Sequence, residues 1–120
     1  MKCISYSQFG EAKKVLCLQE LAKPIPKSNE VLIKLSFSGV NPSDAKARAG
    51  NRPGHTKPEY NLIIPNSDGS GVITSVGAKV DPSRIGEKVW VWNGQWKRAF
   101  GTAAEFISLP STQAIPLPTD

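Results

Sequence analysis

The sequence has few of the side chains that bind transition metals. Its 120 residues include two cysteines, Cys3 and Cys17, and one histidine, His55. A catalytic zinc ion needs three protein ligands, and a structural zinc ion needs a set of four, usually cysteines with histidines. Neither cysteine has a partner at ligand spacing, so Cys and His cannot build either site, and we expect no bound metal. His55 stands alone in an irregular segment, where we expect it to be exposed and without a role.

Long apolar runs and long charge runs are also missing. No stretch reaches the roughly 20 apolar residues that span a membrane, and the start does not resemble a secretory leader. We therefore expect a cytoplasmic protein with no membrane partner and with both thiols buried and free. The net charge is +5, but the basic residues are scattered, so we expect a solvated surface and no nucleic-acid partner.

Glycine and proline, by contrast, are abundant and evenly spread, with ten of each. Many turns of this kind favour short strands over a helical bundle. Strands are predicted at residues 1–7, 15–21, 30–40, 69–76, 88–92, 102–109 and from 114 onward. The fold class is therefore mainly β, a barrel or a sandwich with one or two short helices.

Residues 30–40 carry the clearest strand pattern. Val31, Ile33, Leu35 and Phe37 alternate with polar residues and are predicted to share one buried face, with Leu32 breaking the polar side. The segment that follows predicts a helix of about two turns. It begins with Asn41 as N-cap and Pro42 at the first helical position, and it ends at Gly50.

Two polar clusters lie at the ends of predicted strands: one follows the strand at 30–40, and the other precedes the strand at 69–76. They are Asn41-Pro42-Ser43-Asp44 and Asn66-Ser67-Asp68. Such residues often serve only as caps and turns. No histidine is placed to activate a serine in either cluster. Gly69-Ser70-Gly71 leads into a β-branched strand and predicts close backbone packing, since a phosphate-binding loop would open onto a helix.

The order of several motifs resembles one family along most of the chain. Gly39-Val40-Asn41-Pro42-Ser43-Asp44 resembles the active-site loop of quinone oxidoreductases of the zeta-crystallin type. The segment from Pro65 to Ile73, and then Gly86-Glu87-Lys88-Val89, resemble that family's Gly-rich segment and the strand after it. Ala104-Glu105-Phe106 and Ile115-Pro116-Leu117-Pro118 resemble the pieces that close its barrel.

This resemblance implies a partly open GroES-like β-barrel over residues 1–120. In the family this barrel packs against a Rossmann domain that binds NADP. No Gly-x-Gly-x-x-Gly turn occurs in the sequence, so we expect the Rossmann domain to be absent from this chain. We then expect these residues alone to bind NADPH weakly and to be inactive, and the full-length protein to be a homodimer.

The resemblance also implies a reaction without zinc. Asn41 stands where zinc-dependent alcohol dehydrogenases have a cysteine ligand, and Ser67-Asp68 stands where they have His-Glu. The implied reaction is hydride transfer from NADPH to a quinone or an activated alkene. Asn41 is then the main polar contact near the nicotinamide or the acceptor, Ser43 a second hydrogen-bond donor, and Asp44 a residue that holds the loop.

Other site residues are implied less directly. Lys46 stands where the family often has tyrosine, and Lys46 and Arg48, with Arg52 nearby, are candidates for binding an anionic substrate or the cofactor phosphates. The alternative is a solvated helix face. Ser67, Asp68 and Trp92 are candidates for the substrate pocket. Trp90, Trp92 and Trp96 could stack on a quinone or could pack in the core and against the other domain.

Two other functions stay open on the same scaffold. One is an enoyl or 2-alkenal reductase. The other is a non-catalytic GroES-like binding module of the co-chaperonin kind, because a fold does not determine a function.

Overall fold

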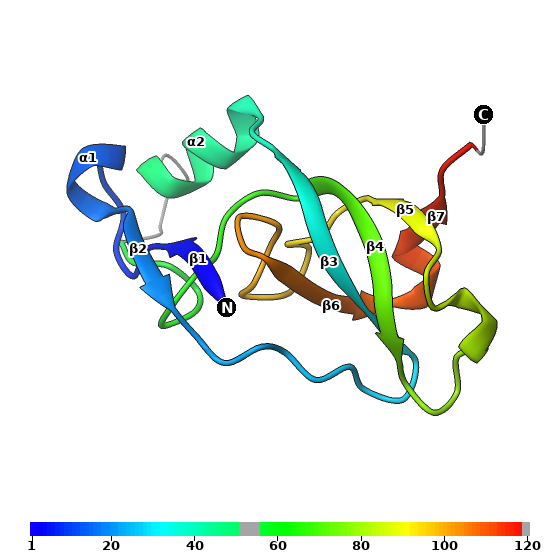
Figure 1. Cartoon of the computed structure of the whole chain (residues 1–120). Helices are drawn as coiled ribbons and strands as arrows, with labels where there is room; N and C mark the ends of the chain where they lie inside the picture. Colours follow the sequence, from blue (N-terminus) through cyan, green and yellow to red (C-terminus); the bar gives the residue numbers. More distant parts are fainter. Residues whose placement is uncertain (51–55, 119–120) are drawn as a thin grey trace.

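The computed structural model describes residues 1–50 and 56–118, so Arg52 and His55 lie outside the described residues. A two-stranded sheet pairs β1 (Lys2–Ser5) with β2 (Cys17–Glu20). An antiparallel five-stranded sheet has the order β6-β3-β4-β5-β7 (Figure 1). Because β6 and β7 are the two edges of this sheet, the barrel is partly open. The mainly β fold class is therefore confirmed.

The strands of the larger sheet are β3 (Glu30–Gly39), β4 (Asp68–Val76), β5 (Lys88–Val91), β6 (Phe106–Pro110) and β7 (Ala114–Pro116). Two 3₁₀ turns, η1 (Pro82–Arg84) and η2 (Ser111–Gln113), connect them. The inner face of the curved sheet is packed with aliphatic residues: Val31, Ile33, Ile73, Val80, Val89, Val91, Ile107, Leu109 and Ala114. Burial of these side chains is the main stabilising contribution of the domain.

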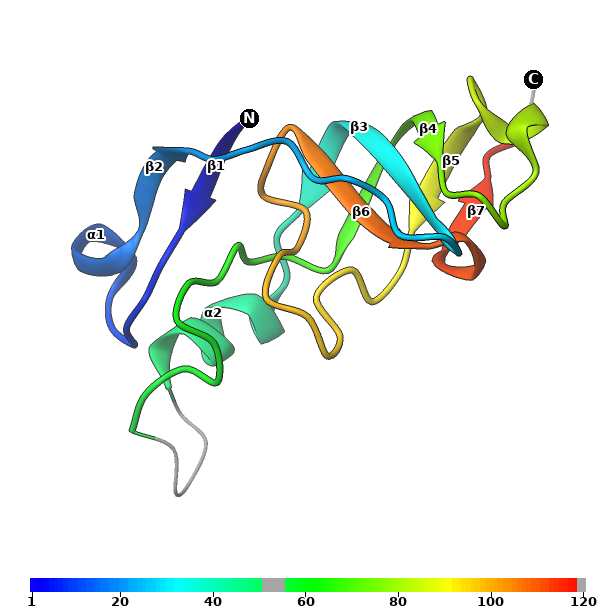
Figure 2. The ribbon, with the colours of Figure 1, turned by 90° about the horizontal axis from the view of Figure 1, so that it is seen from below.

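Helix α2 (Pro42–Ala49) forms where the capping signals predicted it. Asn41 has an extended N-cap conformation, and Gly50 ends the helix in the left-handed region at φ +77°. A Cβ at Gly50 would also lie 2.6 Å from the Phe9 ring. Figure 2 shows α2 below the β1–β2 hairpin and the larger sheet.

Two predictions near the N terminus were wrong. Residue 15 was assigned to the second strand, but Val15 ends a short helix, α1 (Ala12–Val15), and its side chain is buried beside Tyr6 and Ile63. Cys17 was expected to be buried, but it is exposed, while Cys3 is buried and both thiols are free. All four residues of β2 are exposed, because this strand has β1 on one side and no core beneath it.

Phe37 also departs from its predicted face. The register of β3 against β4 shifts between Leu35 and Phe37, so Ser36 is an extra residue in β3. A β-bulge of this kind changes which face the following side chains occupy. Phe37 is therefore 74% exposed, whereas Val31 and Ile33 are fully buried as predicted.

The sixth predicted strand begins later than residue 102. Residues 101–103 pair with the 64–66 segment: Gly101 N–H donates to the Ile64 carbonyl at 2.7 Å, and Thr102 N–H donates to the Asn66 carbonyl at 2.8 Å. A Cβ at Gly101 would lie 2.1 Å from that same Asn66 oxygen. Only glycine allows this close approach, which places Thr102 beside Asn66. Strand β6 therefore begins only at Phe106.

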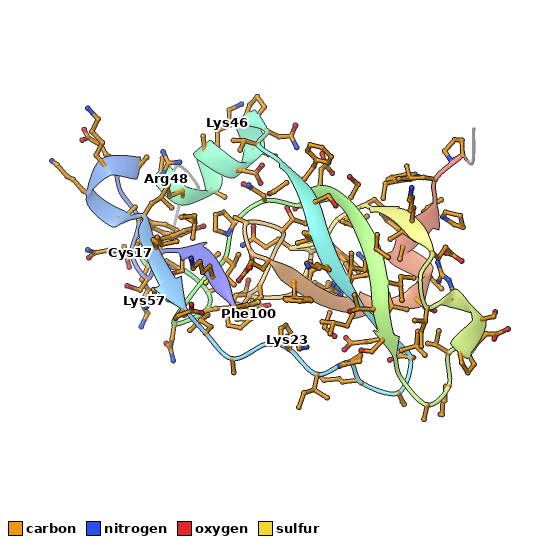
Figure 3. The ribbon with its side chains drawn as sticks, viewed as in Figure 1. Cys17, Lys23, Lys46, Arg48, Lys57 and Phe100 are labelled. Atoms are coloured by element: carbon orange, nitrogen blue, oxygen red, sulfur yellow. The ribbon has the colours of Figure 1, made fainter. Side chains whose placement is uncertain are left out.

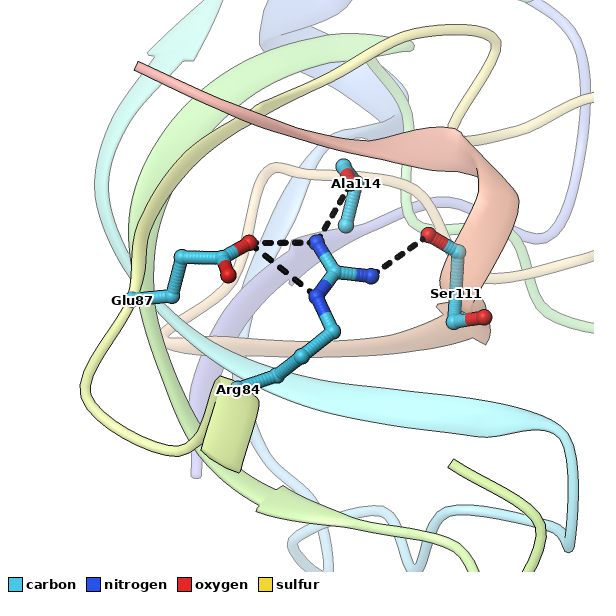
Figure 4. Close-up of polar contacts among 4 residues, drawn as sticks. All are labelled: Arg84, Glu87, Ser111 and Ala114. Carbon is cyan, nitrogen blue, oxygen red and sulfur yellow. Dashed lines mark hydrogen bonds and ion pairs between the residues drawn. The ribbon is translucent and has the colours of Figure 1, made fainter. Parts of the chain in front are cut away.

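One arginine joins η1 to the connection between β6 and β7. The Arg84 guanidinium donates to the Glu87 carboxylate, to the Ser111 carbonyl at 3.0 Å and to the Ala114 carbonyl at 2.7 Å (Figure 4). Its side chain is mostly buried. The contacts therefore hold η1 against the β6–β7 connection.

Within residues 1–50 and 56–118, none of the helices has the length and apolar character needed to cross a membrane.

Candidate active site

The two polar clusters of the sequence meet at one end of the β3–β4 pair. Gly39 of β3 lies opposite Asp68 of β4, so the residues that follow β3 and precede β4 are neighbours. The Asn41 side-chain amide donates a hydrogen bond from Nδ2 to Asp68 Oδ2 at 2.7 Å. A bond between a neutral donor and a carboxylate is stronger than one between neutral groups. The strand register thus joins two candidates that are 27 residues apart.

The start of α2 holds the Asn41 backbone. The Asp44 carboxylate, which is buried, accepts a hydrogen bond from Asn41 N–H at 2.8 Å. A carboxylate in the first helical turn also interacts favourably with the helix dipole. This geometry agrees with a loop-holding role for Asp44.

Three further polar residues support Asp68. Thr102 Oγ1 donates to the Asp68 carbonyl at 2.8 Å and lies 2.9 Å from Ser38 Oγ. Asn66 Nδ2 donates to the same Ser38 oxygen at 2.9 Å. Thr102 is fully buried and Asn66 is nearly so.

Sequence reasoning missed Ser38 and Thr102 as parts of this site. Thr102 is 34 residues from Asp68 and 64 from Ser38 along the chain. No local pattern links such distant residues. The structure shows Thr102 packed close to two glycines, because a Cβ at either Gly69 or Gly94 would lie 3.2 Å from Thr102 Cγ2.

Trp92 directly follows β5. The last paired residues of β4 and β5 are Gly69 and Val91, and continuing this register by one residue sets Trp92 opposite Asp68. Val91 is buried, and Trp92 and Asp68 lie on the outer face, where Trp92 is 42% exposed. The structure therefore joins two of the predicted site residues, Asn41 and Asp68, by a hydrogen bond. The third, Trp92, follows the end of the strand paired with β4.

The next row on the outer face is also aromatic. Ser70 lies opposite Phe37 on one side and Trp90 on the other. Phe37 and Trp90 are both exposed, and the small serine separates them. Trp90 is therefore a surface residue in this chain and does not belong to its core.

The remaining candidates lie around α2 and β4. Ser43 and Lys46 are exposed on α2, and Ser67 accepts a hydrogen bond at its carbonyl from Gly94 N–H at 2.8 Å. Lys46 and Arg48 are two positions apart on a helix and so point in different directions. Figure 3 shows Arg48 at the end of α2 nearer the β1–β2 hairpin.

Arg48 has contacts inside the domain. Its Nε donates to the Gly10 carbonyl at 3.3 Å, and it lines a cavity of about 190 Å³ together with Asp44 and Asn66. Burial raises the pKa of the nearby Tyr6 hydroxyl, and the Arg48 charge opposes that rise. The Arg48 side chain is thus partly committed to holding α2 against the N-terminal segment.

The donor set of the site is an amide and a carboxylate. Among the residues that the structure describes, His, Cys, Asp and Glu do not form any group of three that could hold a metal ion. The chemistry that the site offers is hydrogen bonding: the Asn41 side chain has one N–H that is not donated to Asp68 and is available to a ligand.

Comparison with known proteins gives the family. Residues 27–119 match the model of the alcohol dehydrogenase GroES-like domain. The quinone oxidoreductase of Mus musculus is 31% identical over 118 residues, which are 98% of this chain and 34% of that protein. This chain thus spans about a third of the length of the curated relatives it matches.

Solved structures agree in fold. A Bacillus thuringiensis protein described as a candidate NADPH:quinone reductase superimposes with a TM-score of 0.83 at 29% identity, covering 98% of this chain and 33% of its own. The Escherichia coli quinone oxidoreductase in complex with NADPH gives a TM-score of 0.84 at 22% identity over 98% of this chain and 33% of its own, a likeness of fold. The chain therefore belongs to the alcohol dehydrogenase GroES-like domain family, within the quinone oxidoreductase group of medium-chain dehydrogenases and reductases.

Proposed function

We propose that this domain supplies the acceptor side of the active site of an NADPH-dependent quinone oxidoreductase. The observation that carries the proposal is the Asn41–Asp68 hydrogen bond beside the exposed face of Trp92. A fixed amide next to a flat apolar side chain suits a planar ring with a carbonyl group. The family and the 31% identical quinone oxidoreductase support this proposal.

The residues suit the nicotinamide end of the cofactor better than its phosphates. Asn41 has one side-chain N–H available for a carboxamide oxygen, whereas the sequence contains no Gly-x-Gly-x-x-Gly turn for a pyrophosphate. When bound, NADPH supplies the hydride. We propose that it is held mainly by a Rossmann domain outside residues 1–120, with Asn41 touching the nicotinamide and Lys46 and Arg48 near the phosphates.

The residues of this domain would act on the acceptor oxygen. As negative charge develops there, the second Asn41 side-chain N–H and the Ser43 hydroxyl would donate hydrogen bonds to it. Ser67, Asp68 and Trp92 would line the pocket for the ring. We propose that the reaction needs no metal, because the amide of Asn41 stands where the resemblance places the cysteine ligand, and its side chain is bonded to the Asp68 carboxylate.

The test uses the intact protein that carries this domain. NADPH oxidation is measured with a benzoquinone and with a 2-alkenal, for the wild type, for Asn41→Ala and for the control Asn61→Ala at an exposed residue. We expect kcat/KM for the quinone to fall about 100-fold in Asn41→Ala, as for other lost oxyanion donors, and to stay unchanged in the control. An unchanged Asn41→Ala enzyme contradicts the proposal.

The same assay separates the alternatives. A higher kcat/KM for the 2-alkenal assigns the protein to the enoyl or alkenal reductases, and no turnover with either acceptor favours a binding module. Incubation with a strong chelator should leave quinone reduction unchanged, and a loss that zinc restores would refute the metal-free reaction.

The outer aromatic face suggests where the rest of the protein packs. Phe37, Trp90 and Trp92 expose apolar surface of the kind that proteins usually cover. We propose that the nucleotide-binding domain covers part of this face. We further propose that the intact protein is a homodimer, which sedimentation would test, and a cytoplasmic location stays a prediction.

A further inference from the structure

A chain of hydrogen bonds leads from Asn66 to Asp68, and its direction follows from simple chemistry. A carbonyl can only accept, so the bond between Thr102 Oγ1 and the Asp68 carbonyl uses the Thr102 proton. Asn66 Nδ2 donates to Ser38 Oγ. The proton left for the 2.9 Å contact between Ser38 and Thr102 is therefore that of Ser38.

All of these bonds point the same way. Asn66 donates to Ser38, Ser38 to Thr102, and Thr102 to the backbone of Asp68. Hydrogen bonds aligned in series polarise and strengthen one another. This series of hydrogen bonds thus fixes the backbone of Asp68. The Asp68 carboxylate in turn accepts a hydrogen bond from Asn41 Nδ2 at 2.7 Å.

Thr102 can act only through its neighbours. Its exposed fraction is 0%, and its methyl group packs between Gly69 and Gly94. A ligand on the outer face therefore cannot reach the Thr102 hydroxyl. Removing that hydroxyl would leave the Ser38 proton and the Asp68 carbonyl without this partner.

We propose that Thr102 and Asp68 are positioning residues that set the orientation of the Asn41 side chain. Asp68 takes one amide proton, which leaves a single side-chain N–H of Asn41 for the ligand. Thr102 holds Asp68 where it can do so. The importance of this orientation for turnover rests on the proposed function, but the orientation itself does not.

The first experiment measures the Asn41 side chain directly in the 120-residue chain. NMR records hydrogen exchange of the Asn41 side-chain amide in the wild type, in Asp68→Ala and in Thr102→Val, which has nearly the same shape as threonine. Thr74→Val is the matched control, because Thr74 lies exposed on β4 with a long 3.4 Å hydrogen bond. Thr102→Ser keeps the hydroxyl.

We expect Asn41 side-chain exchange to be about tenfold faster in Asp68→Ala and Thr102→Val, which is the effect of losing one hydrogen bond. Thr74→Val and Thr102→Ser should match the wild type. If Thr102→Val does not fold, Ser38→Ala removes a hydroxyl from the same series of hydrogen bonds at an exposed residue. It should also make Asn41 side-chain exchange faster. The proposal is overturned if the Asn41 side chain of Asp68→Ala exchanges at the wild-type rate. It is also overturned if Thr102→Val, or Ser38→Ala in its place, folds and exchanges at the wild-type rate.

The second experiment uses the intact protein. Thr102→Val should lower kcat for quinone about tenfold, while Thr102→Ser and Thr74→Val keep wild-type turnover. If Thr102→Val accelerates Asn41 exchange but leaves turnover normal, the orientation of the Asn41 side chain does not matter for turnover, and that part of the proposal is refuted. An inactive wild type refutes the proposed function instead, and the exchange result then stands by itself.

Discussion

At the scale of single residues, the two cysteines differ in a way that the sequence did not reveal. Cys3 is 2% exposed and burial raises the pKa of its thiol, whereas Cys17 is on the surface. The thiolate is the reactive form, so both burial and a raised pKa slow the reaction of Cys3.

We therefore predict that an alkylating reagent modifies one thiol per folded chain. Peptide mapping after brief iodoacetamide treatment should find the label on Cys17, and Cys17→Ser should abolish rapid labelling. Cys3 should react only in denaturant. Labelling of Cys3 at the same rate as Cys17 would contradict the described packing of β1.

Asp81 contributes a pH-dependent term to stability. Its carboxylate accepts a hydrogen bond from Ser83 N–H at 2.9 Å at the start of η1, and this bond lowers the pKa of Asp81 below its ordinary value of 3.8. A carboxyl whose pKa is lower in the folded state stabilises the fold above its unfolded pKa. This contribution is lost as the pH falls through the folded pKa.

The expected result is a difference between Asp81→Ala and wild type that depends on pH. The urea midpoint of Asp81→Ala should be lower than that of wild type at neutral pH, and the gap should shrink as the pH falls below 3.8. Glu59→Ala, at an exposed carboxylate, is the control. A gap that stays constant into the acid range would show that the Ser83 contact does not depend on the charge.

At the scale of elements, Arg84 should matter more than an ordinary surface cation. It donates to Glu87 and to two carbonyls that belong to the β6–β7 connection. Hydrogen bonds to charged groups are each worth about 1.5–3 kcal/mol. Loss of the whole guanidinium also leaves both carbonyls without this donor.

We predict that Arg84→Met lowers the free energy of unfolding by about 2–3 kcal/mol. Arg84→Lys should recover little, since an ammonium group cannot reproduce the planar fork. Lys88→Met, at an exposed cation on β5, should change stability by less than about 0.5 kcal/mol. Chemical denaturation measures all three, and an Arg84→Met protein as stable as Lys88→Met would refute the role of this contact.

Elements with strong local signals could be predicted from the sequence. Asn41, Pro42 and Gly50 delimit α2 because caps act within one helical turn. The face of Phe37 could not be predicted, since the bulge that turns it depends on pairing with β4. The same is true of the site. The sequence indicates each of its two polar clusters, but the contact between them depends on the register of β3 against β4.

At the scale of the whole molecule, the domain holds one side of the proposed active site. Asn41 is partly exposed and Trp92 is exposed, and the chain spans about a third of the length of its curated relatives. A site that faces outward in this way needs a second wall to exclude water and hold the cofactor.

We predict that these 120 residues alone neither reduce quinones nor bind NADPH tightly. NADPH oxidation followed by absorbance should not exceed the rate without protein, and calorimetry should detect no tight binding. The intact protein is the positive control. Quinone reduction by the isolated chain would overturn this division of labour between domains.

The exposed tryptophans of the outer face have a practical consequence. All three tryptophans of the chain are exposed, and Trp90 and Trp92 lie on the face that carries Asp68. Indole emission depends on contact with water, so covering this face should shift the emission to shorter wavelengths. The domain therefore carries an intrinsic fluorophore beside its candidate site, and occupation of that site can be followed without any attached dye.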